Sequence, residues 1–391
     1  MKHRNLADAT IAALISVFRE GEVASAAVER TIALQTKWGK RDRNQFAEAV
    51  YEIVRWRRLF EFAAQSEDEW ALLGAFIARQ GGELAAWPEF DQLDGEQLRA
   101  RLAQTDLPRA IQESVPDWLD AYGQEQLGER WGEELHALNR EADVVVRANT
   151  LQISRDELRA QLRERNIESH LVEGVPDALQ LASRPRLNSL DLFRRGAFEV
   201  QDAASQLVAP FLEVEPEQNV VDACAGAGGK TLHLAALMQN EGRLLALDVS
   251  KDKLDELDRR TCRAGVNVKI ARIEKQILRD SRAFADRLLL DMPCSGSGTW
   301  RRQPDSKWRL NPEFLARLQE TQRQILRDTT PMLRPGGKMV YATCSIFPSE
   351  NERQIEAFLA QNPAFELEAE HTISPSQTGF DGFYMARLRK R

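Results

Sequence analysis

Cysteine is scarce in this sequence, and so are long apolar runs. The 391 residues contain only Cys224, Cys262, Cys294 and Cys344. Without a Cys-x-x-Cys spacing a zinc site is disfavoured, and four cysteines are too few for a disulfide framework. No apolar run approaches the ~18 residues of a membrane span, and the short apolar stretch behind the basic first residues is broken by Asp8. We therefore expect a soluble, cytoplasmic, monomeric protein without a metal or a membrane anchor.

An excess of positive charge is also missing, because the formal net charge is -7 at pH 7. The charge is unevenly distributed: basic residues exceed acidic ones by 4 in residues 1–60, acidic residues exceed basic ones by 11 in residues 61–140, and the rest is balanced. The negative net charge disfavours a nucleic-acid partner only weakly, since basic patches remain outside the acidic block of residues 61–140. We interpret the block itself as solvated helix faces.

The first part of the chain has the pattern of a helical domain followed by a small α/β segment. Residues 1–140 have few strand signals and carry apolar residues three and four positions apart. Residues 141–197 change character, and Ser154 with Glu157 has the spacing of a capping box at a helix start. The elements expected there are a strand at 144–149, a helix from 155 to about 165 and a strand near 169–172.

From residue 198 onward, short apolar runs alternate with helical patterns. The expected strands are 219–222, 243–248, 287–291 and 338–343, and the expected helices are about 230–239, 251–264 and 312–333. Continuous apolar strands separated by helices are typical of a parallel, doubly wound sheet. The sequence thus predicts an α/β protein whose Rossmann-like domain occupies residues 198–391.

Four of the predicted strands end on residues that are unusual there, namely Asp222, Asp248, Asp291 and Cys344. In such sheets, ligands bind beyond the carboxyl ends of the strands. Reactive or charged residues at four such ends therefore predict a ligand-binding or catalytic site at this edge of the sheet. The segment after the first of them reads Ala223, Cys224, Ala225, Gly226, Ala227, Gly228, Gly229, Lys230 and Thr231. Its glycines allow a tight turn and a close approach to a ligand at a helix N-terminus.

Three nucleotide-binding patterns compete for this glycine loop. A P-loop requires glycine where Cys224 stands, and a dinucleotide motif that starts at Gly226 requires glycine or alanine where Thr231 stands. An S-adenosylmethionine loop fits, with an acid at the strand end, a glycine-rich turn and Asp248 on the next strand for ribose hydroxyls. A close-packed turn without a ligand is the remaining alternative. We expect S-adenosylmethionine as the cofactor.

Two of the four cysteines lie at this same edge. Cys294 follows Asp291 by three residues, and Cys344 ends the last predicted strand. A lone buried cysteine is usually a small core residue, but a pair at a ligand-binding edge is better interpreted as reactive thiols. A thiolate that adds to carbon 6 of cytosine turns carbon 5 into a nucleophile for a methyl sulfonium.

Such a reaction also needs an acid and a second base. Asp291 has the position to donate a proton to ring nitrogen 3, for which it must be protonated, a state that burial favours. A base must then remove the proton from carbon 5, and Cys294 is the candidate. The target cytosine must also leave any stack with neighbouring nucleotides to reach the pocket.

Several segments resemble the RsmB/Sun family of RNA 5-methylcytosine methyltransferases, and the likeness covers nearly the whole chain. Its glycine loop usually reads Asp-Ala-Cys-Ala-Ala-Pro-Gly-Gly-Lys-Thr, from which this chain departs at Gly226 and Ala227. The other similar segments are 198–207, 298–305, 348–352 and 381–386. The N-terminal helices resemble the RNA-binding domain related to NusB, through Arg41-Asp42-Arg43 and Val54-Arg55-Trp56-Arg57-Arg58.

The resemblance implies roles for individual residues. Cys344, in its Thr-Cys context, would be the nucleophile, and Cys294, in its Pro-Cys context, would assist product release. Lys230 would lie near the reaction centre or the cofactor, and Asp291 would serve both. Glu274 stands where the family usually has a cofactor-binding aspartate. The partner implied is RNA, by family ribosomal RNA.

A basic cluster follows the Pro-Cys loop, and we expect it to contact RNA. Its members are Arg301, Arg302, Lys307, Trp308 and Arg309. Three hypotheses remain open: an RNA cytosine methyltransferase acting on ribosomal RNA, a methyltransferase of the same fold with a tRNA, DNA, protein or other substrate, and a non-catalytic RNA-binding scaffold. Intact Cys344, Cys294 and Asp291 disfavour the scaffold, and the Asp-Met-Pro-Cys sequence disfavours amino-group methylation.

Overall fold

A computed structural model describes residues 3–391 and divides the chain into two compact units. The first comprises Met1–Arg140 with Thr299–Asn311, and the second comprises Glu141–Gly298 with Pro312–Arg391. Met1 and Lys2, at the start of the basic N-terminal segment, lie outside the described residues. Neither unit is a continuous stretch of chain.

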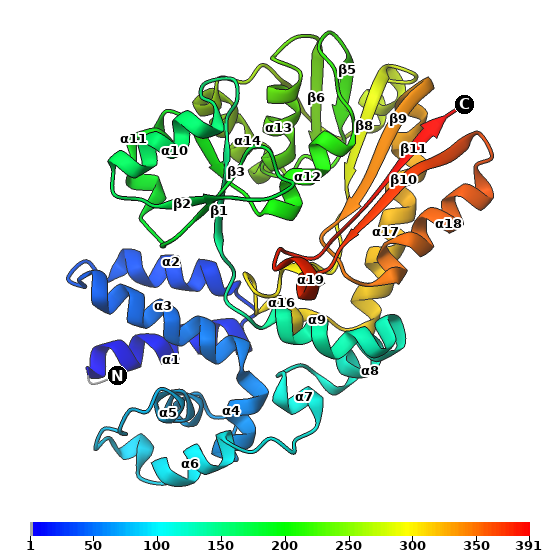
Figure 1. Cartoon of the computed structure of the whole chain (residues 1–391). Helices are drawn as coiled ribbons and strands as arrows, with labels where there is room; N and C mark the ends of the chain where they lie inside the picture. Colours follow the sequence, from blue (N-terminus) through cyan, green and yellow to red (C-terminus); the bar gives the residue numbers. More distant parts are fainter. Residues whose placement is uncertain (1–2) are drawn as a thin grey trace. The chain divides into compact units, whose positions relative to one another are not determined.

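The first unit is helical, as expected from its apolar spacing (Figure 1). Its core is formed by residues such as Phe46, Val50, Phe60 and Leu72, all of them fully buried. Its helices are α1 (Arg4–Arg19), α2 (Ala24–Leu34), α3 (Lys40–Arg55), α4 (Arg57–Ala64), α5 (Glu69–Arg79), α6 (Gly95–Leu102), α7 (Arg109–Gln112), α8 (Asp117–Leu127), α9 (Trp131–Leu138) and α16 (Ser306–Arg309).

The short helix α16 belongs to this unit although the sequence assigned residues 299–311 to the Rossmann-like domain. Lys307 is fully buried, and its Nζ donates to Arg55 O at 2.8 Å and to Asn139 Oδ1 at 3.1 Å. Burial lowers the pKa of Lys307 well below its usual range. The expected RNA contact of Lys307 is therefore wrong, because its amino group is buried and hydrogen bonded inside the helical unit.

Two other members of the predicted basic cluster, Arg301 and Trp308, also make contacts inside the helical unit. Arg301 is only 6% exposed, and its backbone carbonyl accepts a hydrogen bond at 3.1 Å from Arg55, itself 5% exposed. Trp308 donates from Nε1 to Val54 O at 2.7 Å. The Arg301 carbonyl and the Trp308 indole thus attach the segment 299–311 to α3, and the burial of Arg301 corrects its assignment as an RNA contact.

The second unit begins with a four-stranded antiparallel sheet in the order β2-β3-β1-β4. Ser154 and Glu157 form the predicted capping box at the start of α10. Phe198–Val200 pairs with β1, so the domain boundary expected at residue 198 lies too early. The elements are β1 (Val144–Ala148), α10 (Arg155–Glu164), β2 (Ser169–Leu171), β3 (Ala178–Leu181), α11 (Asp191–Arg194) and β4 (Phe198–Val200).

A seven-stranded sheet forms the rest of this unit, in the order β10-β11-β9-β8-β5-β6-β7 (Figure 1). The four expected strands, β5, β6, β8 and β9, are parallel as predicted, and a fifth parallel strand, β7, was not expected. Strands β10 and β11 run antiparallel and were not expected from the sequence either. The strands are β5 (Asn219–Asp222), β6 (Arg243–Asp248), β7 (Lys269–Arg272), β8 (Ala285–Asp291), β9 (Leu333–Thr343), β10 (Phe365–Ile373) and β11 (Phe383–Lys390).

Helices cover both faces of this sheet, because neighbouring strand residues point to opposite sides. Val220 and Val221, both fully buried, thus belong to two different core clusters. This arrangement confirms the Rossmann-like fold. The helices are α12 (Ala203–Phe211), α13 (Gly229–Leu237), α14 (Lys251–Ala264), α15 (Lys275–Asp280), α17 (Pro312–Thr329), α18 (Glu352–Gln361) and α19 (Pro375–Thr378).

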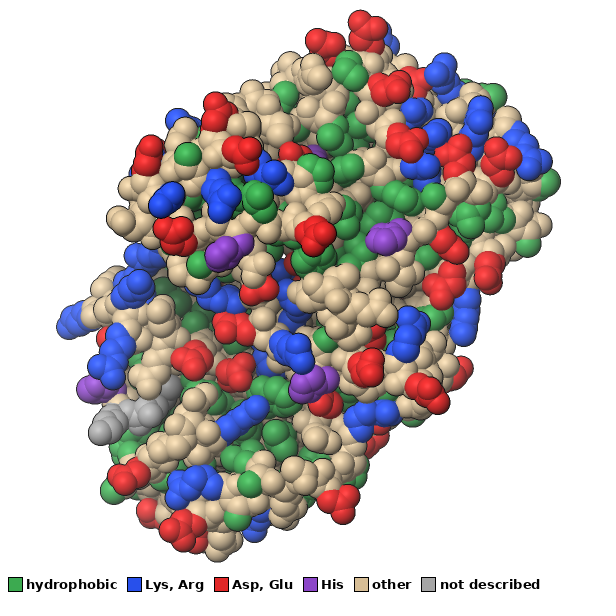
Figure 2. All heavy atoms as spheres, in the orientation of Figure 1, with side chains coloured by type: hydrophobic (Ala, Val, Ile, Leu, Met, Phe, Trp, Pro, Cys, Tyr) green, Lys and Arg blue, Asp and Glu red, His purple; other side chains and the backbone are tan. Residues whose placement is uncertain are grey.

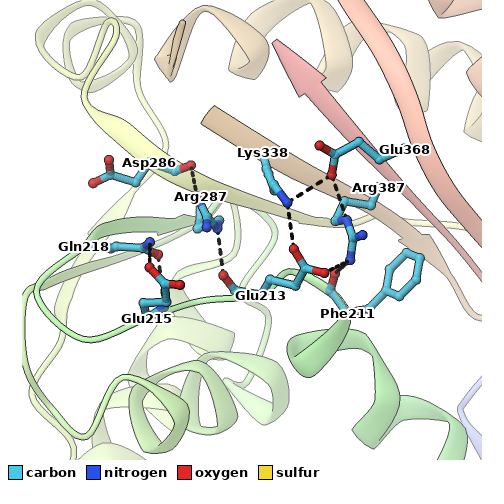
Figure 3. A network of polar contacts seen from close by, with 9 residues as sticks. All are labelled: Phe211, Glu213, Glu215, Gln218, Asp286, Arg287, Lys338, Glu368 and Arg387. Atoms are coloured by element: carbon cyan, nitrogen blue, oxygen red, sulfur yellow. Dashed lines mark hydrogen bonds and ion pairs between the residues drawn. The ribbon is translucent and has the colours of Figure 1, made fainter. Parts of the chain in front are cut away.

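A network of ion pairs joins the segment after α12 to the antiparallel strands (Figure 3). The Glu213 carboxylate forms ion pairs with Lys338 Nζ at 2.7 Å and with Arg387 Nη1 at 2.6 Å. The same two cations contact Glu368 at 3.2 and 3.0 Å. Four alternating charges that share partners hold their side chains better than an isolated surface pair does. The network therefore helps to fix β9, β10 and β11, and with them the strand that ends in Cys344.

Candidate active site

The glycine loop connects β5 to α13 and depends on two left-handed backbone positions. Gly226 has φ +54° and Gly228 has φ +90°. A Cβ on Gly228 would lie 2.1 Å from Leu257 Cδ1, so only glycine fits there. A Cβ on Gly226 would meet nothing within 4 Å, so the loop faces open space at that residue. The predicted close approach to a ligand is sterically available there.

Asp248 ends β6 and is bound to this loop. Its Oδ2 accepts the Gly226 amide hydrogen at 2.8 Å, and its Oδ1 accepts the Ser250 amide hydrogen at 2.8 Å. The carboxylate is half-buried and still has lone pairs for further donors. Glu274 is exposed at the start of α15 and follows β7, the strand next to β6. In that pairing Asp248 is opposite Arg272.

Asp222, the first acid of the series, is not on the surface of the site. It is fully buried, and its Oδ2 accepts a hydrogen bond from Thr231 Oγ1 at 2.7 Å, while its Oδ1 has no hydrogen-bond partner within the described part of the chain. Burial raises the pKa of Asp222 to about 7. Burial therefore favours the protonated form of Asp222 in the folded protein.

This shift predicts a measurable dependence of stability on pH. The folded state holds a proton on Asp222 that the unfolded chain releases above pH 3.8, so stability falls as the pH rises from 3.8 to about 7. For a shift from 3.8 to about 7, the loss is at most about 4 kcal/mol. We expect Asp222→Asn to remove this slope, measured as the free energy of unfolding in urea at about pH 5 and about pH 8.

The matched control for that measurement is Asp280→Asn, which removes an exposed acid on α15. Its free energy of unfolding should keep the wild-type dependence on pH. Equal slopes for wild type and Asp222→Asn would contradict the assignment of the proton to Asp222.

Asp291 and Lys230 form a pair at the ends of β8 and α13. Lys230 Nζ donates to Asp291 Oδ2 at 2.6 Å and lies 5.2 Å from the centre of the Phe383 ring. The side chain of Asp291 is 31% exposed and that of Lys230 is 9% exposed. Burial, on which the expected protonation of Asp291 depended, is therefore incomplete at this side chain, and its role as a proton donor stays a prediction.

The two edge cysteines are brought together by the parallel pairing of β8 and β9, in which Asp291 is opposite Ala342. Their Sγ atoms are 3.4 Å apart, and both thiols are free. The contact with Cys344, followed by burial, raises the pKa of the Cys294 thiol well above its usual range. The structure therefore joins the predicted pair into one site.

The third cysteine of the site has a different environment. Burial and then the negative charges of Asp222, Asp291 and Asp248 raise the pKa of Cys224 well above its usual range. A thiol that keeps its proton is a poor nucleophile. Cys224 is therefore a loop residue rather than a third reactive thiol. Cys262 is exposed on α14, away from the strand ends.

The loops that carry Cys294 and Cys344 are connected by several hydrogen bonds. Gly298 donates its amide hydrogen to Cys344 O at 2.9 Å, and Gly382 donates to Gly298 O at 2.8 Å. A Cβ on Gly298 would lie 2.1 Å from Gly382 O. This close approach explains why glycine stands at positions 298 and 382, in two segments that resembled the family but had no predicted role.

Sequence reasoning missed a buried acid in this region. Glu350 is fully buried and accepts hydrogen bonds from residues beside each cysteine. Its segment, 348–352, was noticed for its likeness to a family, yet nothing in the pattern indicated what the acid touches. Within residues 3–391, no group of three or more His, Cys, Asp or Glu side chains could hold a metal ion.

Comparisons with known proteins agree with this geometry. Residues 209–389 match the family model of the 16S rRNA methyltransferase RsmB/F, and residues 115–188 match the ferredoxin-like domain of RsmF/B-like methyltransferases. The chain is 35% identical to ribosomal RNA small subunit methyltransferase B of Vibrio cholerae over 77% of this chain and 70% of that protein. It is 37% identical to the protein of the same name from Klebsiella pneumoniae over 71% of this chain, and spans 66% of that protein's length.

Solved structures support the same fold. The crystal structure of PH0851 has a TM-score of 0.83 at 24% identity and matches over 98% of both chains. A methyltransferase homologue from Pyrococcus horikoshii has a TM-score of 0.64 at 26% identity, over 72% of this chain and 98% of that one. NSun6 from Pyrococcus horikoshii, solved with SFG, has a TM-score of 0.65 at 22% identity, over 71% of this chain and 99% of that one.

The described helices include none that is both long and apolar enough to cross a membrane. The glycine loop, the acids at the strand ends and the paired cysteines occur together with a family model and with relatives that match most of the chain. The chain belongs to the RsmB/F family of methyltransferases.

Proposed function

We propose that the protein is an S-adenosylmethionine-dependent RNA methyltransferase that forms 5-methylcytosine in ribosomal RNA. The observation that carries the proposal is the pair of free thiols, 3.4 Å apart, at the carboxyl ends of adjacent parallel strands. Two sulfurs at such a spacing suit chemistry on two adjacent ring carbons. Relatives named for methylation of ribosomal RNA support the choice of substrate.

The residues around the glycine loop fit the cofactor. Asp248 would accept hydrogen bonds from ribose hydroxyls, the open space at Gly226 admits a ligand, and Val249, 68% exposed, offers an apolar surface for a flat ring. Glu274 would add a second acid from the neighbouring strand. Support comes from the similar NSun6 fold, which was solved with SFG, an analogue of S-adenosylmethionine. The bound cofactor supplies an activated methyl group.

The environment of the thiols supports Cys344 as the nucleophile. Cys294 keeps its proton because its pKa is raised, so it can donate a hydrogen bond to a Cys344 thiolate at 3.4 Å. That thiolate adds to carbon 6 of the cytosine ring, which makes carbon 5 nucleophilic. Elimination then removes the carbon 5 proton to a base and releases the Cys344 sulfur, and Cys294 assists this elimination by donating its hydrogen bond to the departing sulfur.

The pair of Lys230 and Asp291 supports the addition step by supplying a proton. A cytosine that accepts sulfur at carbon 6 gains negative charge, which a proton on nitrogen 3 neutralises. Lys230 Nζ donates a hydrogen bond to Asp291 Oδ2 at 2.6 Å, so a proton that moves from Lys230 to Asp291 can pass on to nitrogen 3 and leaves Lys230 as a neutral amine. This route does not depend on an Asp291 kept protonated by burial.

RNA contact is assigned to exposed basic residues in the helical unit. Lys37, Lys40 and Arg41 are exposed where α2 gives way to α3, and Figure 2 shows Lys and Arg side chains gathered at that end of the unit. Exposed cations of this kind bind phosphate groups without dependence on sequence. They replace the buried Lys307 and Arg55 as the proposed contacts.

The test is incubation of the full-length protein with tritiated S-adenosylmethionine and ribosomal RNA that lacks 5-methylcytosine, followed by digestion to nucleosides. Label is expected in 5-methylcytidine. Label in another nucleoside, or transfer to tRNA but not to ribosomal RNA under the same conditions, would contradict the proposed reaction or substrate. Binding of the cofactor without any transfer would favour a scaffold.

A further inference from the structure

A buried carboxyl group is hydrogen bonded to the residue that follows each edge cysteine. Glu350 Oε1 accepts the Ser295 amide hydrogen at 2.8 Å, and its Oε2 accepts from Ser295 Oγ at 2.5 Å and from Ser345 Oγ at 2.6 Å. Ser295 follows Cys294, and Ser345 follows Cys344. One carboxyl group thus contacts the loops of both thiols.

Further contacts surround this carboxyl group. Ser297 Oγ lies 3.0 Å from Ser345 Oγ and accepts the Ile346 amide hydrogen at 3.0 Å. Gln322, from α17, donates to Pro293 O at 3.0 Å and to Glu350 Oε1 at 3.4 Å. Glu350 itself is 0% exposed. Its donors therefore come from the two cysteine loops and from the helix that packs behind them.

This arrangement makes the spacing of the cysteines depend on Glu350. A buried carboxyl group has no water to replace a lost donor, so any shift of one loop relative to the other leaves it with too few hydrogen bonds. The donors are rigidly connected to the sulfurs, because each serine is the next residue after a cysteine. A change in the distance between Cys294 and Cys344 would therefore be opposed by the loss of hydrogen bonds to Glu350.

We propose that Glu350 is a positioning residue that holds the loops of Cys294 and Cys344 at the spacing their chemistry requires. The inference rests on the proposed function for its consequence in catalysis, but its geometric part stands by itself. Glu350 touches neither sulfur in this arrangement and acts through Ser295 and Ser345. The Glu350 side chain thus controls the spacing at which the two thiols approach the cytosine ring.

The spacing can be measured without RNA by closing a disulfide between the two cysteines with diamide, which takes up the two electrons and two protons that the thiols release. The rate of closure is divided by the rate at which iodoacetamide alkylates each thiol, so that a change in thiol reactivity is removed. Peptide mass spectrometry identifies the Cys294–Cys344 bond. The variants are Glu350→Gln and, as a matched control, Glu356→Gln, which removes an exposed acid on α18.

We expect Glu350→Gln to close the disulfide at least about tenfold more slowly than wild type after this correction, while Glu356→Gln closes at the wild-type rate. If Glu350→Gln does not fold, as judged by circular dichroism and cofactor binding, the double variant Ser295→Ala with Ser345→Ala removes two donors and keeps the acid. It should slow closure in the same direction. Closure within twofold of wild type in the variant that folds would overturn the proposal.

Methylation supplies the second readout. Glu350→Gln should lower kcat by roughly tenfold or more at an unchanged KM for S-adenosylmethionine, and Glu350→Asp should recover part of the loss. Lost methylation with normal disulfide closure would refute positioning, since the acid would then act in another way. Slowed closure in a protein whose wild type methylates no RNA would keep the positioning role and reject the proposed function, so the two failures are distinguishable.

Discussion

Replacing Cys344 with alanine is expected to lower methyl transfer to RNA by on the order of 10⁴-fold or more. Without its sulfur, nothing adds to carbon 6 of the cytosine, and carbon 5 remains too poor a nucleophile to accept a methyl group. The loss should be in the transfer step alone, because Cys344 directly follows β9, whereas the glycine loop that would hold the cofactor follows β5 and is unchanged. Single-turnover transfer of tritiated methyl groups and the Kd for S-adenosylmethionine measure the two parts.

The control for this prediction is Cys262→Ala, which removes an exposed thiol on α14 and should leave the transfer rate unchanged. A Cys344→Ala protein that still methylates within tenfold of the wild-type rate would reject Cys344 as the nucleophile. If transfer were instead lost in Cys294→Ala with no adduct formed, the two roles would be exchanged.

Replacing Cys294 with alanine is expected to leave a covalent complex between the protein and RNA. Cys344 still adds to the ring in this variant, but the thiol 3.4 Å away, which assists removal of the carbon 5 proton, is gone. Elimination of the sulfur is then slow, and the adduct accumulates. It should appear as a band of higher mass in denaturing gels that is sensitive to ribonuclease and depends on added RNA.

The adduct has a built-in control, since the double variant Cys294→Ala with Cys344→Ala has no sulfur left to form it. We expect no band of higher mass from that protein. An adduct in the double variant would point to another nucleophile, and rapid turnover by Cys294→Ala would remove the assisting role from Cys294.

The parts of the structure that follow from local pattern were predicted well from the sequence. The parallel strands β5 and β6 have the expected bounds, and the capping box at Ser154 forms as the spacing indicated. Asp248 and the two thiols meet at one edge because parallel strands all present their carboxyl ends there. Periodicity determines an element, and strand direction then determines which ends meet.

The unpredicted parts depend on contacts between distant segments. Lys307 is a basic residue in a basic stretch, and its burial depends on an acceptor 252 positions away on the chain. Glu350 is a single acid among 60 acidic residues, and only the fold brings it to the serines beside the thiols. The pairing of Asp291 with Lys230 was not predicted for the same reason, since only the fold brings the start of α13 beside the end of β8.

The discontinuity of the helical unit has a consequence for how the protein is made. Its α16 lies in residues 299–311, and the carbonyl of Arg55 has Lys307 as its donor. During synthesis, the first 140 residues emerge early and must wait until more than half of the remaining chain has been translated before their last helix arrives. Because α16 directly follows the residues around Cys294, the helical unit can finish folding only after the thiol-bearing loop has left the ribosome.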